Sequence, residues 1–186
     1  MKKLFPILLM VLGVAFVAAG GYAMYRGFDA NDQVHDELVA QNITTPEDAS
    51  IPNALVDDKD TAHSMAEIIE VHALEATGGL TYAEMGRFAT PDGDPAGTSD
   101  ESQAVIGSDG RPVANNARNT AFQASALRTS LFSSVMAFEI STLVVGIGAL
   151  LLLLGFAVGG VGVALAGLAL PKFAAKVHVE PVAAAH

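Results

Sequence analysis

Apolar residues gather in two blocks, Leu4 to Tyr25 and Val135 to Leu170, on either side of a long polar section. Within the second block no side chain is charged from Ile140 to Leu170, a stretch of thirty-one residues. As a helix this stretch would be roughly 46 Å long, whereas the hydrocarbon core of a bilayer is about 30 Å thick. The pattern therefore predicts a transmembrane helix with length to spare, ending at the breaker Pro171.

The first block follows the basic start Met1 to Lys3. A short positive region before an apolar run is typical of a signal peptide or a signal anchor, and Ala18 to Ala23 offers small residues that a signal peptidase accepts. The apolar run is about twenty-two residues long, which exceeds the usual core of a signal peptide. The length therefore favours an uncleaved anchor, with Tyr22 and Tyr25 at its outer interface.

The polar section between the two blocks has helical periodicity. Apolar residues recur at helical spacing in Phe28 to Gln41 and in Thr61 to Thr77. Gly78-Gly79 stands where the C-terminal cap of the second helix is expected. The sequence therefore predicts two helices that are too small to bury a large core by themselves.

The remainder of the polar section divides into a loop and the start of a long helix. Ala89 to Pro112 has three prolines and four glycines, a composition that favours a flexible loop. Asn115-Asn116 is suited to cap the following helix. Because no breaker separates this helix from the second apolar block, one helix is expected from about Ala117 to about Leu170.

These patterns predict an all-α membrane protein in which two transmembrane helices flank a small helical, loop-rich extracytoplasmic domain. The expected parts are an N-terminal transmembrane anchor at 1–25, an acidic extracytoplasmic helical domain at 26–134 with a flexible loop at 89–112, a C-terminal transmembrane helix at 135–170 and a cytoplasmic tail at 171–186.

The basic residues that flank the two blocks predict their orientation. The ends nearest the chain termini carry Lys2, Lys3, Lys172 and Lys176, whereas the opposite ends carry Arg26 and Arg128. Because the flanks richer in Lys and Arg stay in the cytoplasm, both termini are expected there, with residues 26–134 outside a plasma membrane that the chain crosses twice.

Charge and composition narrow the classes of partner. Residues 26–134 hold eighteen of the twenty acidic residues, which accounts for the net charge of −10. A strongly acidic section argues against nucleic acid and against docking on anionic lipid, and it suits a basic partner or solubility. The chain has no cysteine, which excludes disulfides, thiolate metal sites, iron–sulfur clusters and cysteine nucleophiles.

Two stretches have some features of a metal site. His63, Glu67 and His72 fall in one predicted helix, but the two histidines are nine residues apart and face opposite ways. Asp92 to Gln103 has some acids of a calcium loop, but its twelfth position is Gln where a bidentate Glu is needed. We therefore expect no catalytic, cofactor or metal residues, and no small-molecule substrate.

Small and polar residues near the two blocks are the stronger candidates for a role. Gly155-x-x-x-Gly159 is a pattern that lets helix backbones approach closely in lipid, which makes both glycines candidates for packing within the chain or with a partner. Glu139 lies about one turn before the uncharged run, where an acid either reaches water or pairs with a cation. Arg128 and Glu139 are therefore candidates for polar contacts at the outer interface.

Three stretches together carry a family resemblance: Leu38 to Asp48, His72 to Tyr82 and Ala126 to Leu131. They resemble the actinobacterial prokaryotic respiratory supercomplex association factor family, whose members often carry an automatic label of aromatic ring-opening dioxygenase. The resemblance implies a non-catalytic accessory subunit of the cytochrome bcc–aa3 supercomplex, with bcc and aa3 oxidase subunits and the lipid bilayer as partners and a role in assembly or stability. The dioxygenase label would require a two-histidine, one-carboxylate iron site, which His63 and His72 do not supply.

Two other functions stay open. One is a membrane-anchored extracytoplasmic metal-binding protein or metal-dependent enzyme that uses His63, Glu67 and His72. The other is an envelope sensor, although its tail, Phe173 to His186, is too short to signal alone.

Overall fold

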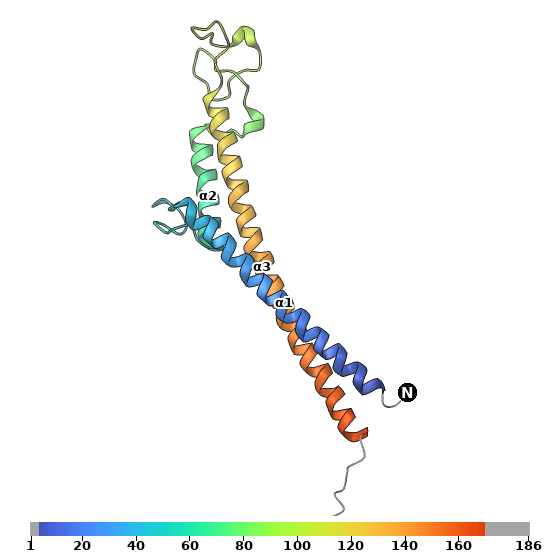
Figure 1. Ribbon diagram of the computed structural model, residues 1–186. Helices are drawn as coiled ribbons and strands as arrows, with labels where there is room; N and C mark the ends of the chain where they lie inside the picture. Colours follow the sequence, from blue (N-terminus) through green and yellow to red (C-terminus); the bar gives the residue numbers. More distant parts are fainter. Residues whose placement is uncertain (1–3, 170–186) are drawn as a thin grey trace, which may run out of the picture. The chain divides into compact units, whose positions relative to one another are not determined.

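The computed structural model describes residues 4–169, which form three long helices and two short 3₁₀ helices (Figure 1). In chain order these are α1 (Leu4–Gln41), α2 (Lys59–Ala76), η1 (Tyr82–Glu84), η2 (Glu101–Gln103) and α3 (Asn116–Ala169). The described part has no β-strand, only isolated bridges between single residues. The predicted tail at 171–186 and the four flanking lysines lie outside the described residues.

The helix bounds agree with the expected all-α class. A single helix, α3, begins at Asn116 and continues to Ala169 because no proline or loop interrupts it, as the sequence predicts. In α1 the first apolar block and the predicted helix from Phe28 to Gln41 are one continuous helix. Gly27 does not interrupt α1. The expected boundary between residues 25 and 26 therefore falls inside a helix.

The chain divides into two compact units, each built from parts of the long helices. Unit 1 comprises the described residues up to Met24 and from Ile147 onward, and unit 2 is Tyr25–Gly146. Both α1 and α3 are long and apolar enough to cross a membrane, which is compatible with a two-pass membrane protein.

Unit 2 has a small hydrophobic core between α2, α3 and the second half of α1. The buried core residues are Leu38, Val56, Ala62, Ala66, Leu131 and Phe138. α2 lies beside α3 in the opposite direction (Figure 1), since Lys59 at its start contacts Glu139 whereas Ala66 and Glu70 contact Arg128. The side chains of Ala62 and Ala66 are fully buried, so their small size lets the two helices approach closely.

The segment between α1 and α2 is tied down by buried hydroxyl groups. Thr45 is 1% exposed, and its Oγ1 accepts a hydrogen bond from the backbone N–H of Ala54 at 3.0 Å. Ser64 of α2 accepts hydrogen bonds from the backbone N–H of Ile51 and from the Ser50 hydroxyl, both at 2.9 Å. These bonds satisfy polar groups that would otherwise be buried without partners, and they hold the segment on α2.

Both ends of α2 are defined by capping groups. The Asp58 carboxylate accepts a hydrogen bond from the backbone N–H of Thr61 at 2.8 Å, and the Thr61 hydroxyl accepts one from the backbone N–H of Asp58 at 3.1 Å. This reciprocal capping box starts the helix at Lys59, two residues before the predicted start at Thr61. At the other end Gly78 has φ +66° and Gly79 has φ +83°, and the N–H of Gly79 donates to the carbonyl of Leu74. The expected glycine cap is confirmed.

The segment 89–112, which composition predicts to be a flexible loop, has its own pattern of backbone hydrogen bonds. Bridges join Phe88 to Thr98 and to Ala114, and Ile106 to Pro112. Its mobility stays a prediction, but the composition alone does not indicate these contacts.

Asn115 joins this segment to the start of α3. Its side chain is buried, and Nδ2 donates to the carbonyls of Gly86 at 3.1 Å and Pro95 at 2.9 Å. Its Oδ1 accepts from the backbone N–H of Ala117 at 3.0 Å, which confirms the predicted cap of α3. One amide therefore both begins the helix and closes the loop.

We expect Asp58→Ala to lower the free energy of unfolding by about 1 kcal/mol, because it removes the cap of α2. Hydrogen bonds from the backbone N–H and the hydroxyl of Thr61 hold the pKa of Asp58 below its usual value. A carboxyl with a lowered folded-state pKa contributes its full stability above its unfolded value of about 3.9 and loses it as the pH falls further. The difference between wild type and variant should therefore be constant near neutral pH and shrink below about pH 4.

Thermal unfolding in mild detergent at several pH values measures this difference. Asp60→Ala is the matched control, because Asp60 is an exposed acid in the first turn of α2 that does not cap it. An equal loss of stability in both variants, or a difference that persists unchanged at low pH, would contradict the assigned role of Asp58.

Candidate functional site

The most regular feature of the molecule is a row of small residues between α1 and α3 of unit 1. In α1 the buried positions Pro6, Gly13 and Gly20 recur every seven residues. In α3 the buried positions Gly148, Gly155 and Gly162 recur with the same spacing. We call Gly13, Gly20, Gly148, Gly155, Gly159 and Gly162 the glycine seam.

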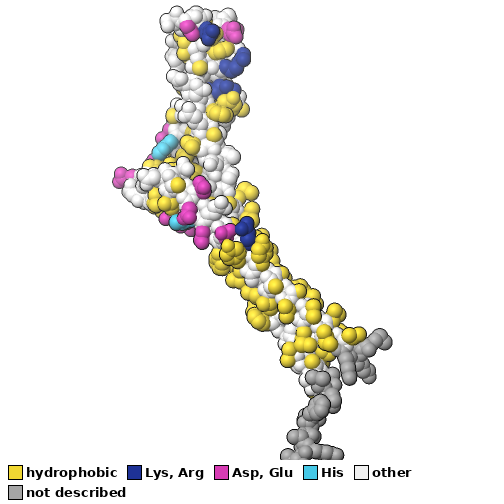
Figure 2. Space-filling model, viewed as in Figure 1, with side chains coloured by type: hydrophobic (Ala, Val, Ile, Leu, Met, Phe, Trp, Pro, Cys, Tyr) yellow, Lys and Arg dark blue, Asp and Glu magenta, His cyan; other side chains and the backbone are white. Residues whose placement is uncertain are grey.

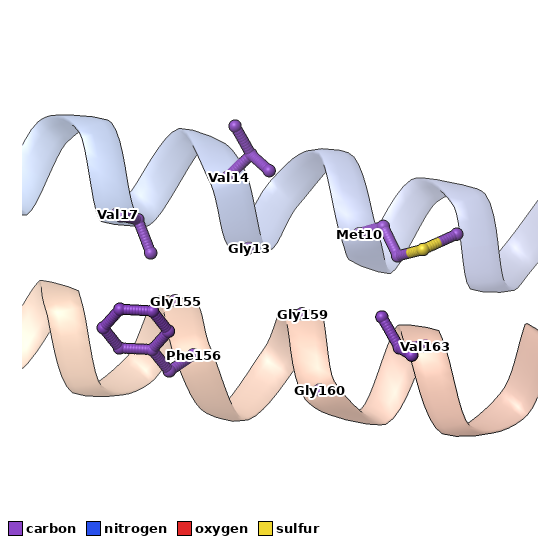
Figure 3. A pocket seen from close by; sticks show the side chains of 9 residues that line it. All are labelled: Met10, Gly13, Val14, Val17, Gly155, Phe156, Gly159, Gly160 and Val163. Carbon is purple, nitrogen blue, oxygen red and sulfur yellow. The ribbon is translucent and has the colours of Figure 1, made fainter.

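The two backbones approach so closely along the glycine seam that a methyl group would not fit at most of its positions. A Cβ on Gly13 would lie 2.6 Å from the Cα of Gly159, and a Cβ on Gly20 would lie 2.6 Å from the carbonyl oxygen of Gly148. A Cβ on Gly155 would lie 2.8 Å from the carbonyl oxygen of Gly13. Figure 3 shows Gly13 of α1 opposite Gly155 and Gly159 of α3.

The order of the contacts shows that the pair is antiparallel. The carbonyl of Pro6 lies near Gly162, Gly13 lies near Gly155, and Gly20 lies near Gly148. A seven-residue repeat keeps the same helix face in contact over several turns if the helices supercoil slightly to the left. In lipid, helix association depends on van der Waals packing and small residues, and this seam supplies both.

The two predicted packing residues lie at the centre of the seam. Gly155 and Gly159 both face α1 of the same chain, although Gly159 is less tightly packed, since a Cβ there would lie 3.7 Å from the Cα of Gly13. Gly146, Gly160 and Gly167 of α3 have open space where a Cβ would be. The glycines of α3 therefore divide into a face that contacts α1 and positions that do not.

The four-residue spacing of Gly155 and Gly159 indicates close packing, but it does not contain the seven-residue repeat. The repeat is visible in the sequence of both helices: α1 has Gly13, Gly20 and Gly27, and α3 has Gly148, Gly155 and Gly162. Gly27 is also close to α3, within unit 2, since a Cβ on Gly27 would lie 3.0 Å from the carbonyl oxygen of Ser141.

A shallow groove of about 380 Å³ runs beside the seam, lined by Met10, Gly13, Val14, Val17, Gly155, Phe156, Gly159, Gly160 and Val163 (Figure 3). None of these residues has a polar side chain. Such a surface can contact lipid chains or another apolar helix, and it has no acid or base that could transfer a proton.

The two predicted polar contact residues, Arg128 and Glu139, form ion pairs within the chain. The carboxylate of Glu139 accepts from the Nζ of Lys59 at 2.8 Å, and this contact raises the pKa of Lys59. Arg128 donates to the carbonyl of Ala66 at 3.1 Å and pairs with the carboxylate of Glu70. Both residues therefore join α3 to α2.

The residues of the metal alternative are held apart. The Nε2 of His63 lies 3.4 Å from the carboxylate of Glu67, whereas the Nε2 of His72 lies 2.6 Å from the carboxylate of Asp48. The hydrogen bond from His72 lowers the pKa of Asp48. No group of three or more His, Asp or Glu side chains with metal-site geometry occurs in residues 4–169.

The acids of the calcium-like stretch are engaged in local turns. Asp94 Oδ1 accepts from the backbone N–H of Ala96 at 2.9 Å, and Asp100 Oδ1 accepts from the backbone N–H of Ser102 at 2.9 Å. The hydroxyl and the backbone N–H of Ser102, which both donate to this carboxylate, lower the pKa of Asp100. The carboxylates stabilise their own loop.

Comparisons of the chain with protein-family models, with curated proteins and with solved structures found no match.

We expect Gly155→Ala to weaken the pairing of α1 and α3, because the added methyl group would meet the backbone of Gly13 and Val17 at 2.8 Å. Overpacking of this kind typically costs about 1–3 kcal/mol. Because the chain has no cysteine, spin labels can be attached at two introduced cysteines, Val11→Cys and Val161→Cys, both at exposed positions. The distance between the labels, measured by pulsed electron spin resonance, should lengthen and its distribution should broaden.

Gly160→Ala is the matched control, since it adds the same methyl group to the same helix in open space. This variant should leave the label distance unchanged. Identical distributions in Gly155→Ala and in the unmodified chain would show that the seam is not closely packed in solution.

Proposed function

We propose that the chain is a non-catalytic accessory subunit that crosses the plasma membrane twice and associates with the cytochrome bcc–aa3 supercomplex, supporting its assembly or stability. In this proposal unit 1 spans the bilayer, both termini are cytoplasmic and residues 26–134 are extracytoplasmic.

The surface of unit 1 supports the membrane part of the proposal. The glycine seam places small residues between the helices, so the larger apolar side chains point outward. Val14, Leu150 and Phe156 are 70%, 67% and 66% exposed. Figure 2 shows hydrophobic side chains covering this helix pair. Exposed apolar surface on this scale is unfavourable in water and favourable against lipid or another membrane helix.

The positions of the three stretches that carry the resemblance support the family part of the proposal. All three lie in unit 2 and contact one another there. Asp48 of the first stretch pairs with His72 of the second, and Leu38 of the first shares the core with Leu131 of the third. Residues that resemble one family at three separate places in the sequence therefore form a single packed structure, which is the observation that carries the proposal.

A second candidate function gains no comparable support. The metal-dependent alternative needs His63, Glu67 and His72 to converge, and in the structure His72 contacts the Asp48 side chain on a different segment.

We expect purification of a C-terminally tagged chain in mild detergent to recover haem-bearing bcc and aa3 subunits in near-stoichiometric amounts, as measured by mass spectrometry and a visible spectrum. The double substitution Gly155→Leu with Gly159→Leu should reduce this recovery strongly, because it separates the helices that present the outward surface.

Gly146→Ala serves as the control, since a Cβ there would meet nothing within 4 Å. A chain that emerges alone and colourless would refute the proposal. Unchanged copurification of the double variant would show that the packing of α1 on α3 is not needed for the association. Metal analysis of the purified protein would then test the metal-dependent alternative.

A further inference from the structure

A second groove, of about 540 Å³, lies on unit 2 where the end of α1 meets α2 and α3. We call it the domain groove. It is lined by Glu37, Leu38, Gln41, Ile43, Met65, Ile69, Leu127, Ser130, Leu131 and Ser134.

The floor of the domain groove is an uncovered extension of the hydrophobic core. Ile43, Met65 and Ile69 pack against the core but are only partly buried. Leu127 lies at the edge and is 55% exposed. Apolar side chains that line a concave surface of this size are typical of a site that another molecule covers.

One wall of the domain groove carries one acid, Glu37, and further acids follow it along α1. Glu37 also lines two adjoining hollows along α1, the second of which is bounded by Asp29, Asp32 and Asp36. Figure 2 shows acidic side chains gathered on unit 2. An occupant of the groove would therefore meet negative charge along one edge.

Of the acids along this wall, only Asp29 forms an ion pair with a Lys or Arg of the described residues. Lys59 pairs with Glu139 and Arg128 with Glu70, both on the α2–α3 side, and Arg26 pairs with Asp29. Within residues 4–169, neither Asp32 nor Glu37 has a Lys or Arg within ion-pair distance. The charge of the wall is thus available to a partner.

We infer that the domain groove binds an amphipathic, positively charged helix of another protein. An apolar ridge with a spacing of three or four residues would cover Leu127, Met65 and Ile69, and Lys or Arg beside that ridge would face Glu37. The charge of the wall disfavours acidic peptides, nucleic acid and a second copy of this acidic chain, because like charges would face each other. That this helix belongs to the partner complex rests on the proposed function. The groove itself is formed by residues of unit 2 alone.

Synthetic peptides test this inference on the full chain in nanodiscs of zwitterionic lipid. The probe is a fluorescent helical peptide of about fourteen residues with leucines at positions i, i+3, i+4 and i+7 and lysines on the other face. One control peptide replaces every lysine by glutamate, and another keeps the composition but scrambles the order. Binding is measured by anisotropy, with empty nanodiscs subtracted.

We expect the cationic peptide to bind at least about tenfold more tightly than the anionic or scrambled peptide, a difference of about 1.4 kcal/mol. Leu127→Gln should weaken binding about fivefold or more, because it removes apolar contact area. Glu37→Gln should weaken it about two- to fivefold, and added salt should reduce this difference. The matched controls Val71→Gln and Glu75→Gln change exposed residues of α2 that do not line the groove, and they should leave affinity unchanged.

Several outcomes would overturn the inference. Equal binding of the anionic peptide would remove the role of the acidic wall, and equal binding of the scrambled peptide would leave only general attraction between opposite charges. An equal effect of Leu127→Gln and Val71→Gln would place the contact elsewhere. A dimer that Leu127→Gln converts to a monomer would show that a second copy covers the groove.

This test and the test of the proposed function fail separately. If the peptides bind as expected but no haem-bearing subunit copurifies, the groove is a binding site for a cationic helix and the association with the supercomplex is refuted. If the subunits copurify but the cationic, anionic and scrambled peptides bind equally well, the association with the supercomplex is supported and the domain groove is not the surface that contacts the partner.

Discussion

The close approach of the α1 and α3 backbones in unit 1 is the contact on which that unit depends. In lipid the hydrophobic effect does not drive helices together, so their association depends on van der Waals contact between their atoms. Glycine at Gly13, Gly20, Gly148 and Gly155 removes the side chains that would keep the backbones apart. Because these positions recur every seven residues, the register of the pair is set over several turns and a shift by one residue would bring side chains into the seam.

Unit 2 is stabilised by other interactions, namely hydrophobic burial and ion pairs. Its core is small, and Ala62 and Ala66 let α2 lie close to α3, so hydrophobic burial supplies most of its stability. The ion pairs that join α2 to α3 are partly exposed, with 46% and 59% exposure for Lys59 and Glu139, and exposed pairs of this kind add little to stability because solvent screens them. Their main effect is to align the two helices.

The sequence predicts the long elements well because their signals are local. The apolar run and the lack of a breaker predict the full length of α3, and Gly78-Gly79 predicts the end of α2. The start of α2 is missed because Asp58, its cap, lies before the first apolar position of the pattern. Contacts between distant residues are not predicted, since nothing local links Glu139 to Lys59, eighty residues earlier. The four-residue glycine pattern indicates packing at Gly155 and Gly159, but only the seven-residue repeat in both helices indicates the partner face.

The placement of charge in unit 2 has a consequence for any partner. Arg128, Lys59 and Arg26 are engaged with acids of their own chain, so they contribute alignment within the unit and little positive potential to its surface. Glu37 lines an apolar groove, where a cation from a partner would be partly shielded from water and its attraction to the carboxylate would be stronger. Specificity then follows from the combination, because a purely basic segment gains nothing from the groove floor and a purely apolar one leaves this carboxylate without a counter-charge.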